Sequence, residues 1–310
     1  MKLIVLLVGV STVLTSVVTG QQRNYHELVS LAEKSYNNKE YDTSGKYYDR
    51  AFKTQKGTSN DYYNAACSWA LAGNKNKALD YLKESTDLGW LNIGHMKNDT
   101  DLDSLHQTKE WEELISKLEE RVTEYESSLN KPLMRELETI NESDQKYRTI
   151  MDSVQKTFGQ DSKEMKGLWT KQSKTDSLNL IRIKEIIKEH GYPGKSLVGN
   201  QSSTAWLVIQ HADLQTQEEY LPILQGAAEK GELSKSSYAL LVDRVRMRKG
   251  EKQLYGSQIQ VKNGTFEIYP IEDEPNVNSR RAEMGLEPLE DYVKHWGIQY
   301  KLPAKTTRQH

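Results

Sequence analysis

Apolar residues recur through much of the chain at intervals of three and four, which places them on one face of an α-helix. One long run begins at Trp111 and another at Leu133, on either side of Asn130-Lys131-Pro132. Their apolar positions are Trp111, Ile115, Leu118, Val122, Tyr125 and Leu129, then Leu133, Leu137, Ile140, Tyr147, Met151, Val154 and Phe158. Both runs predict helices that pack along a partner, and Gly159 is the expected end of the second.

The chain before residue 92 repeats itself. A shift of 34 residues pairs small residues with small ones and bulky residues with bulky ones. The pairs are Ala32 with Ala66, Ser44 with Ala78, Tyr47 with Tyr81, Tyr48 with Leu82, and Ala51 with Ser85. This period is typical of tetratricopeptide repeats, so residues 25–92 resemble two such helical hairpins. Two repeats cannot bury their own faces, so we expect the next helix pair, after an Asp-rich loop at residues 98–103, to cap them.

Beyond residue 160 the pattern predicts shorter helices and one β-hairpin. A polar stretch rich in Lys and Ser, at residues 161–177, leads into apolar helical positions at 178–187, 203–211, 220–224 and 238–245. Residues 255–261 and 265–271 flank Asn263-Gly264, a pair that favours a tight hairpin turn. A loop with Arg280-Arg281 and a helix near residues 289–296 follow. The predicted fold class is mainly α, with tetratricopeptide-like helical hairpins followed by a helical domain that contains one β-hairpin.

The first residues of the chain are typical of a secretory signal. Lys2 precedes a 16-residue apolar run at positions 3–18, and Val18-Thr19-Gly20 provides small or modest residues for cleavage. We expect a signal peptide at residues 1–20, an extracytoplasmic protein that is secreted or periplasmic, and no stable membrane anchor after cleavage. Cys67 is the only cysteine, so no intrachain disulfide can form, and we expect it to be a small buried helix residue.

Composition narrows the function classes. The 310 residues allow two domains, and 42 Lys and Arg against 44 Asp and Glu leave no basic surplus for nucleic acid. Gly191-Tyr192-Pro193-Gly194-Lys195-Ser196 lacks the first Gly of a phosphate-binding loop and follows a helix rather than a strand. His26-Glu27 begins like a zinc-protease helix without the second His. The sequence therefore predicts no cofactor and no metal.

A series of short motifs occurs in order along the second half of the chain. The motifs are Asp144-Gln145-x-Tyr147-Arg148, Gly191-Tyr192-Pro193, Val198-Gly199, Ala205-Trp206-Leu207, Gln210-His211-Ala212-Asp213, Asp243-Arg244-Val245, Gln253-Leu254-Tyr255-Gly256-Ser257-Gln258 and Arg280-Arg281-x-x-x-Gly285-Leu286. Together they resemble a bacterial family of helical domains of unknown function, which is sometimes fused behind tetratricopeptide repeats. The likeness spans residues 133–296, with Ser257 in place of a Thr and Tyr192 in place of a common Trp. It implies a domain boundary and a bacterial, extracytoplasmic setting, but no reaction.

The same motifs supply the candidate site. His211, Asp213 and Asp243 are candidate catalytic residues, because a carboxylate could orient His211 as a general acid or base. A His-x-Asp metal site remains open as well. Candidate ligand-binding residues are Asp144, Arg148, Arg244, Tyr255, Gln258, Arg280 and Arg281. In the alternative interpretation these charges form internal ion pairs, beginning with Asp144 and Arg148 one helical turn apart.

The sequence thus predicts an exported protein in two parts. Residues 21–130 form helical repeats with a capping helix, and these repeats bind a protein or peptide partner. Residues 133–296, with a hairpin near 253–271, form a domain that acts as a binding or structural module. Residues 297–310 form a tail. Tyrosines suited to recognition or packing are Tyr36, Tyr41, Tyr47, Tyr48, Tyr62, Tyr63 and Tyr81. Whether the chain is an enzyme stays open; the alternative is an extracytoplasmic hydrolase using His211 with Asp213 or Asp243 and arginines that hold an anionic substrate.

Overall fold

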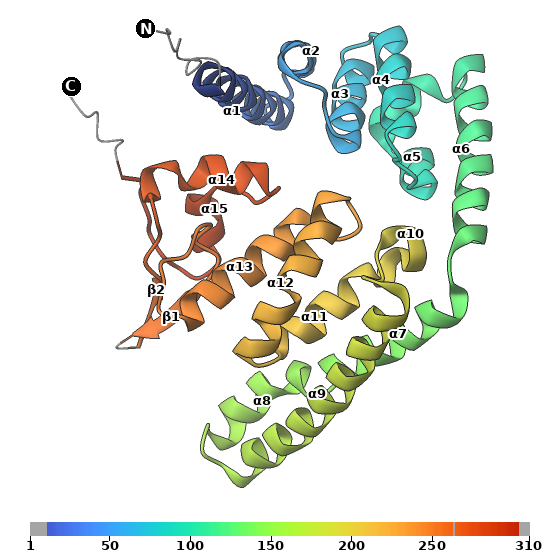
Figure 1. Cartoon of the computed structure of the whole chain (residues 1–310). Helices are drawn as coiled ribbons and strands as arrows, with labels where there is room; N and C mark the ends of the chain where they lie inside the picture. Colours follow the sequence, from blue (N-terminus) through green and yellow to red (C-terminus); the bar gives the residue numbers. More distant parts are fainter. Residues whose placement is uncertain (1–10, 263, 304–310) are drawn as a thin grey trace, which may run out of the picture. The chain divides into compact units, whose positions relative to one another are not determined.

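The chain is mainly α-helical, as the pattern of apolar residues predicts. The computed structural model describes residues 11–262 and 264–303, with side chains from residue 24 onward. Within them, helices account for the regular structure apart from one two-stranded antiparallel sheet (Figure 1). Residues 1–10 of the predicted signal peptide and residues 304–310 of the predicted tail lie outside the described residues. Contacts divide the chain into unit 1, residues 1–125, and unit 2, residues 126–310.

Unit 1 is built from two helical hairpins followed by a closing segment. Its elements are α1 (Ser11–Asn37), α2 (Tyr41–Thr54), α3 (Ser59–Leu71), α4 (Lys75–Asp87), α5 (Ile93–Asn98), the 3₁₀ helix η1 (Thr100–Leu105) and α6 (Lys109–Ser128). α1 packs on α2, and α3 packs on α4. α1 and α3 end 34 residues apart, and α2 and α4 begin 34 residues apart, so the helix boundaries follow the period of the sequence repeat.

Small residues at the repeating positions let these helices approach one another. Ala32 and Ala66 are fully buried, and so is Ser44, whose Oγ donates a hydrogen bond of 2.8 Å to the carbonyl of Ala32. A Cβ on Gly45 of α2 would lie 2.5 Å from the indole ring of Trp69 in α3. Any larger residue at Gly45 would therefore push α2 away from α3.

The segment after the hairpins completes the core of unit 1. Met96 of α5 and Leu102 of η1 are fully buried against α3 and α4. Trp111, Ile115 and Leu118, on one face of α6, join the same core. The first half of α6 therefore covers the apolar side that two hairpins leave open.

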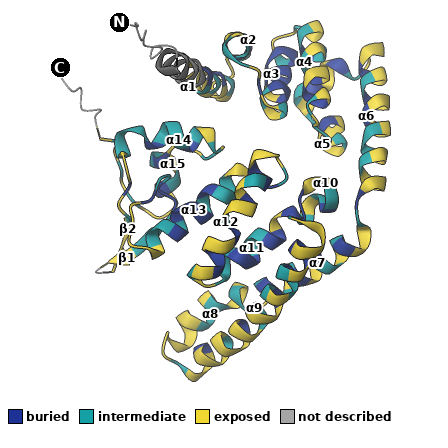
Figure 2. Ribbon diagram, viewed as in Figure 1, coloured by how far each residue is buried: buried dark blue, intermediate teal, exposed yellow. Residues whose placement is uncertain are grey.

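Unit 2 surrounds a second core. Its elements are α7 (Lys131–Gln145), α8 (Arg148–Phe158), α9 (Lys163–His190), α10 (Lys195–Val198), η2 (Gly199–Ser203), α11 (Thr204–His211), α12 (Leu214–Glu229), α13 (Lys235–Arg248), β1 (Ile259–Lys262), β2 (Thr265–Ile268), η3 (Glu274–Asn276), α14 (Val277–Glu283) and α15 (Leu289–Lys294). Buried apolar residues of α7 and α9 to α13 form one cluster, including Leu137, Ile183 and Ile209 (Figure 2). A smaller cluster joins Ile271 to α14 and α15.

The β-hairpin lies where the Asn-Gly pair predicts it. β1 and β2 pair antiparallel, with Ile259 opposite Ile268 and Lys262 opposite Thr265. Gly264 has a positive φ of 79°, which a turn of this kind requires. The strands are shorter than the expected stretches of residues 255–261 and 265–271.

Three helical segments differ from the sequence-based expectation. The polar stretch at residues 161–177 is not a link: from Lys163 onward it is the first half of α9. The run from Leu133 to Phe158 divides at residues 146–147 into α7 and α8, and α8 has no buried residue. Arg280 and Arg281 lie in α14 rather than in a loop.

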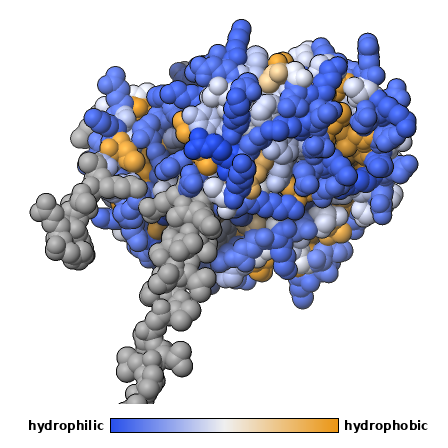
Figure 3. Space-filling model, turned by 90° about the horizontal axis from the view of Figure 1, so that it is seen from above, coloured by the Kyte–Doolittle hydropathy of each residue, from blue (hydrophilic) through white to orange (hydrophobic). Residues whose placement is uncertain are grey.

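One face of the surface is mainly polar. The face shown in Figure 3 is mostly hydrophilic, with apolar residues in small separate patches. Over residues 11–262 and 264–303, no helix combines the length and the apolar character needed to cross a membrane.

Candidate functional site

Two of the sequence motifs meet at Asp144 in unit 2. Asp144, near the end of α7, is fully buried. Its carboxylate lies 3.2 Å from Nη1 of Arg148 and 3.2 Å from Nδ1 of His211, which ends α11. Gln145 donates a third contact, of 2.7 Å. The buried carboxylate is therefore surrounded by donors, as a charge in the interior requires.

Two residues of α9 extend this Asp144 network. Arg148 reaches Asp176 at 2.8 Å through Nη2. The amide of Gln172, 1% exposed, donates 3.0 Å to the carbonyl of Asp144 and 2.7 Å to Asp176. These contacts join α7, α9 and α11 through polar groups, while apolar residues join them elsewhere. The expected pair of Asp144 and Arg148 is present, and it is part of a larger network.

His211 has 19% of its side chain exposed, so it is accessible from outside although Asp144 is not. Nδ1 of the His211 ring is the nitrogen that contacts Asp144, and Nε2 is the nitrogen that does not. A carboxylate in this position fixes the orientation of an imidazole, which is one requirement of a general base. The same bond also satisfies a buried charge, so the geometry serves a structural role equally well.

A second group of candidates meets at Asp243 on α13. This carboxylate is fully buried and accepts hydrogen bonds from the backbone amides of Leu254, Tyr255 and Ser257. The hydroxyl of Ser257 donates another, of 2.9 Å. Asp243 thereby fixes the loop that leads from α13 into the hairpin.

The two candidate arginines of α14 hold the same loop from its other side. Arg281 is 1% exposed and donates to the carbonyls of Tyr255 at 2.7 Å and Glu287 at 2.6 Å, with its guanidinium over the ring of Tyr292. Arg280 donates to the carbonyl of Leu254 at 2.8 Å. Burial lowers the pKa of the Arg281 guanidinium. All these donors are directed at the protein backbone.

The remaining candidates occupy separate positions. Asp213 caps α12 and accepts from the backbone amide of Thr216 at 2.8 Å, which lowers the pKa of the Asp213 carboxyl. Arg244 donates 3.1 Å to the carbonyl of Gln210, and burial lowers its pKa. Gln258 donates to the Ser257 hydroxyl at 3.0 Å. The structure thus places His211 with Asp144, and Asp243 with Tyr255, Gln258, Arg280 and Arg281, in two groups.

The segment that resembles part of a phosphate-binding loop carries a carboxylate of its own. Glu232 accepts a hydrogen bond of 2.9 Å from the backbone amide of Ser196, and a Cβ on Gly194 would lie 2.3 Å from its oxygen. A carboxylate therefore takes the position that a phosphate would need.

A polar and aromatic pocket lies in unit 1, and none of the candidate catalytic or ligand-binding residues lines it. Its volume is about 480 Å³. Residues from α1, α2, α3, α5 and η1, and from the residue before η1, form its wall: Glu33, Tyr36, Asn37, Tyr48, Tyr63, Asn64, Cys67, Ser68, His95, Asp99 and Asp101. Volumes of this order are typical of small-ligand and side-chain pockets.

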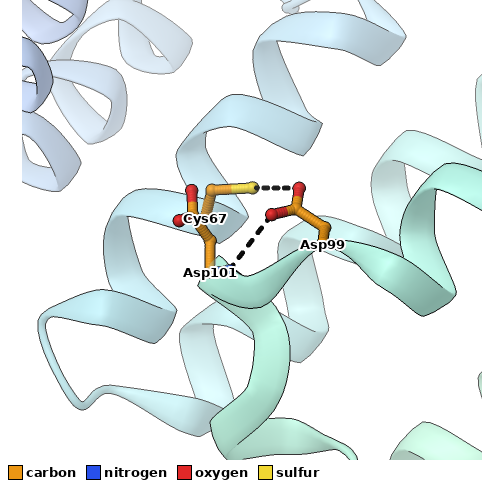
Figure 4. A group of neighbouring side chains, drawn as sticks. All are labelled: Cys67, Asp99 and Asp101. Atoms are coloured by element: carbon orange, nitrogen blue, oxygen red, sulfur yellow. Dashed lines mark hydrogen bonds between the residues drawn. The ribbon is translucent and has the colours of Figure 1, made fainter.

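Cys67, Asp99 and Asp101 lie close together in the wall of this pocket (Figure 4). The thiol of Cys67 lies 3.7 Å from Oδ2 of Asp99, and the backbone amide of Asp101 donates 3.1 Å to Oδ1. One ligand atom from each of the three residues lies within 4.8 Å of the others, a spacing that a metal ion tolerates. Burial and the two carboxylates raise the pKa of the Cys67 thiol well above its usual range, so the thiol stays protonated at neutral pH and is a poor metal ligand.

Tyrosine hydroxyls orient both carboxylates. Tyr63 donates 2.7 Å to Asp99, and Tyr36 donates to Asp101. His95 lies 3.5 Å from Asp99 through Nε2. The sequence signals for this pocket were the Asp-rich segment after residue 98 and the surplus of tyrosines, but only the fold brings them onto one wall.

The comparisons with known proteins concern unit 2. A family model described as a family of unknown function, DUF6624, matches residues 131–305. No curated protein and no solved structure matches the chain. The match includes every residue of the Asp144 and Asp243 groups and covers more than half of the sequence, and on this evidence the chain belongs to the DUF6624 family.

Proposed function

We propose that this is an exported binding protein in which tetratricopeptide-like repeats of unit 1 hold a peptide segment of a partner protein, while unit 2 is a supporting or second binding module. The observation that carries the proposal is the pocket of about 480 Å³ in unit 1. α1 and α3, the first helices of the two hairpins, both contribute to its wall. Helical repeats commonly use such shared surfaces to bind extended partners.

The wall of the pocket offers one accessible aromatic ring beside polar groups. Tyr48 and Tyr63 are 1% and 4% exposed and belong to the core of unit 1, so the half-buried Tyr36 is the tyrosine that can present aromatic surface to a partner. Asn37 and Asn64 are exposed at the pocket and offer amide groups to a peptide backbone. An aromatic wall edged by amides is a common arrangement for a peptide site.

The supporting role of unit 2 is inferred from how its charged residues are used. Asp243, Arg280 and Arg281 direct their hydrogen bonds to the loop between α13 and β1 or to residues near it. A hydrolase acting through His211 remains the alternative, and the contact of 3.2 Å with Asp144 favours it. Asp213 and Asp243, the partners that this alternative expected for His211, bond to backbone amides instead.

The export signal belongs to the same proposal. Cleavage after Gly20 would release a chain that begins at Gln21 and works outside the cytoplasm, secreted or in the periplasm. Mass spectrometry of the N-terminal peptide from the native host tests this point. A peptide that begins at Gln21 supports export, and a peptide that retains residues 1–20 contradicts it.

Selection of peptides from a displayed random library, on the chain from residue 21 onward, tests the binding function. The variant Asn64→Trp fills the pocket without changing its charge, and Asn60→Trp, on an exposed part of α3 outside the pocket, is the matched control. We expect selected peptides to bind the parent chain and Asn60→Trp alike and to lose binding to Asn64→Trp. If no peptide is selected, or if Asn64→Trp binds as the parent does, the proposal fails.

A further inference from the structure

The pocket of unit 1 carries negative charge without a basic residue beside it. Three of the residues in its wall are acidic: Glu33, Asp99 and Asp101. Among the described residues that line it, none is Lys or Arg, and His95 is the one residue that gains positive charge on protonation. Carboxylates brought together in this way repel one another and favour a cation between them.

Two of these carboxylates have bonding capacity to spare. The Glu33 side chain is exposed and makes no hydrogen bond and no ion pair with another described residue. Asp101 receives the Tyr36 hydroxyl on Oδ2, which leaves Oδ1 without a donor in the described part of unit 1. Desolvation, followed by the charge of Asp61, raises the pKa of the Glu33 carboxyl, and desolvation raises that of Asp101. Ionised carboxylates without an internal donor bind water or a donor from a partner.

The aromatic wall favours the same kind of group. The faces of tyrosine rings attract cations, most strongly where water is excluded. Tyr48 and Tyr63 are 1% and 4% exposed, and Tyr63 is stacked on Trp90, so both rings are enclosed in the core. The half-buried Tyr36 is the tyrosine of the wall that a cation can reach. The Tyr36 and Tyr63 hydroxyls already donate to Asp101 and Asp99, so the rings and the carboxylates are held in fixed positions around the pocket.

We propose that the pocket receives a basic side chain, lysine or arginine, of the partner peptide. The inference rests on the proposed function and specifies the chemistry of the partner. The ammonium or guanidinium group would donate to Glu33 and Asp101, and its methylene stem would lie along the ring of Tyr36. The partner supplies the positive charge that unit 1 itself does not place in the pocket.

The test uses peptides selected from the displayed library and synthesised with each lysine or arginine replaced by norleucine. Binding is measured to the parent chain, to Glu33→Gln and to Asp101→Asn, which keep the shape of each side chain and remove its charge. The matched controls are Glu27→Gln and Asp103→Asn, because both residues are exposed in unit 1 and neither lines the pocket. Free lysine amide, added as a competitor, separates a small-molecule amine site from a peptide site.

The expected result is an excess of lysine or arginine among the selected peptides. Replacing one such residue by norleucine should weaken binding to the parent chain about tenfold. The same replacement should matter little in Glu33→Gln and Asp101→Asn, while both control variants should behave as the parent does. Binding should also weaken as the salt concentration rises.

Three other results would overturn the inference, and they separate it from the proposed function. One such result is that selected peptides lose binding to Asn64→Trp and yet need no basic residue. That result would support the peptide site and refute the inference that the pocket receives a basic side chain. If free lysine amide competes as well as the peptide does, the ligand of the pocket is a small amine and not a peptide side chain. Failure to select any peptide would refute the binding function itself.

Discussion

The acidic residues of unit 1 and unit 2 are used in opposite ways. In unit 2, Asp144 is satisfied by Arg148, His211 and Gln145, and Asp243 by three backbone amides and a hydroxyl. In the pocket of unit 1, the carboxylates meet tyrosines, other acids and His95, and the described residues that line the pocket include no Lys or Arg. A buried carboxylate with a full set of internal donors holds a fold together. A carboxylate without one is free to bind a partner.

The largest effect should follow removal of a satisfied carboxylate. Asp243→Ala leaves the amides of Leu254, Tyr255 and Ser257 without an acceptor, and we expect it to destabilise unit 2 by about 3–5 kcal/mol. The exposed Asp161 is the matched control, and Asp161→Ala should change stability by less than about 0.5 kcal/mol. Calorimetric unfolding measures both variants. Equal transitions would show that Asp243 is not a structural support.

A smaller loss should follow at His211. His211→Ala removes one donor from Asp144 but leaves Arg148 and Gln145 in place, so we expect a loss of about 1–2 kcal/mol in unit 2. His295→Ala, at an exposed histidine, serves as the control. Urea unfolding of the two variants provides the measurement. An unchanged stability, together with loss of a hydrolytic activity, would favour the enzyme alternative instead.

Neutralising a carboxylate of the pocket should stabilise unit 1, whereas the two substitutions above destabilise unit 2. Because the pKa of Glu33 is raised, the folded state holds its proton more tightly than the unfolded state does, and the stability of unit 1 falls as pH rises through the ordinary and then the raised pKa. Glu33→Gln removes this loss. We expect the variant to melt at or slightly above the parent temperature near neutral pH, with the difference vanishing at acid pH.

Thermal scans of Glu33→Gln and the control Glu27→Gln across that pH range measure the effect. A variant that melts below the parent at neutral pH would mean that Glu33 has an internal partner. The gain in stability is predicted to accompany the loss of peptide binding, since the same unpaired charge causes both.

The smallest effect concerns the cysteine. Since burial and the nearby carboxylates raise the pKa of the Cys67 thiol, iodoacetamide should modify the folded protein much more slowly than the unfolded chain at neutral pH. Mass spectrometry over time follows the reaction. Rapid modification of the folded chain would show an accessible thiolate and would make metal binding by Cys67, Asp99 and Asp101 a serious alternative.

Much of the architecture was predictable because local patterns decide it. The 34-residue shift located the two hairpins of unit 1, and the Asn-Gly pair located the β-hairpin. The first half of α9 was missed because its buried face is partly polar: Gln172 follows Met165 at an interval of seven, and both residues are buried. A pattern of apolar residues cannot reveal a helix whose buried face is partly made of amides.

The grouping of the candidate residues could be predicted only in part. The motif order marked Asp144, His211, Asp243 and the arginines as a set, but which of them meet depends on contacts across 67 residues, as between Asp144 and His211. The residues of the pocket in unit 1 were even harder to predict as a group. Glu33 comes from α1 and Asp101 from η1, and no local spacing relates them.

The pKa values of Glu33 and Asp101 test the central contrast most directly. An NMR titration of their carboxyl carbons, on the intact chain without a partner, should give both pKa values above the ordinary range for these residue types. Adding a selected peptide with a basic side chain should lower them. If both carboxyls titrate at or below their ordinary values in the free protein, the pocket already contains its counter-charge and the account of unit 1 is wrong.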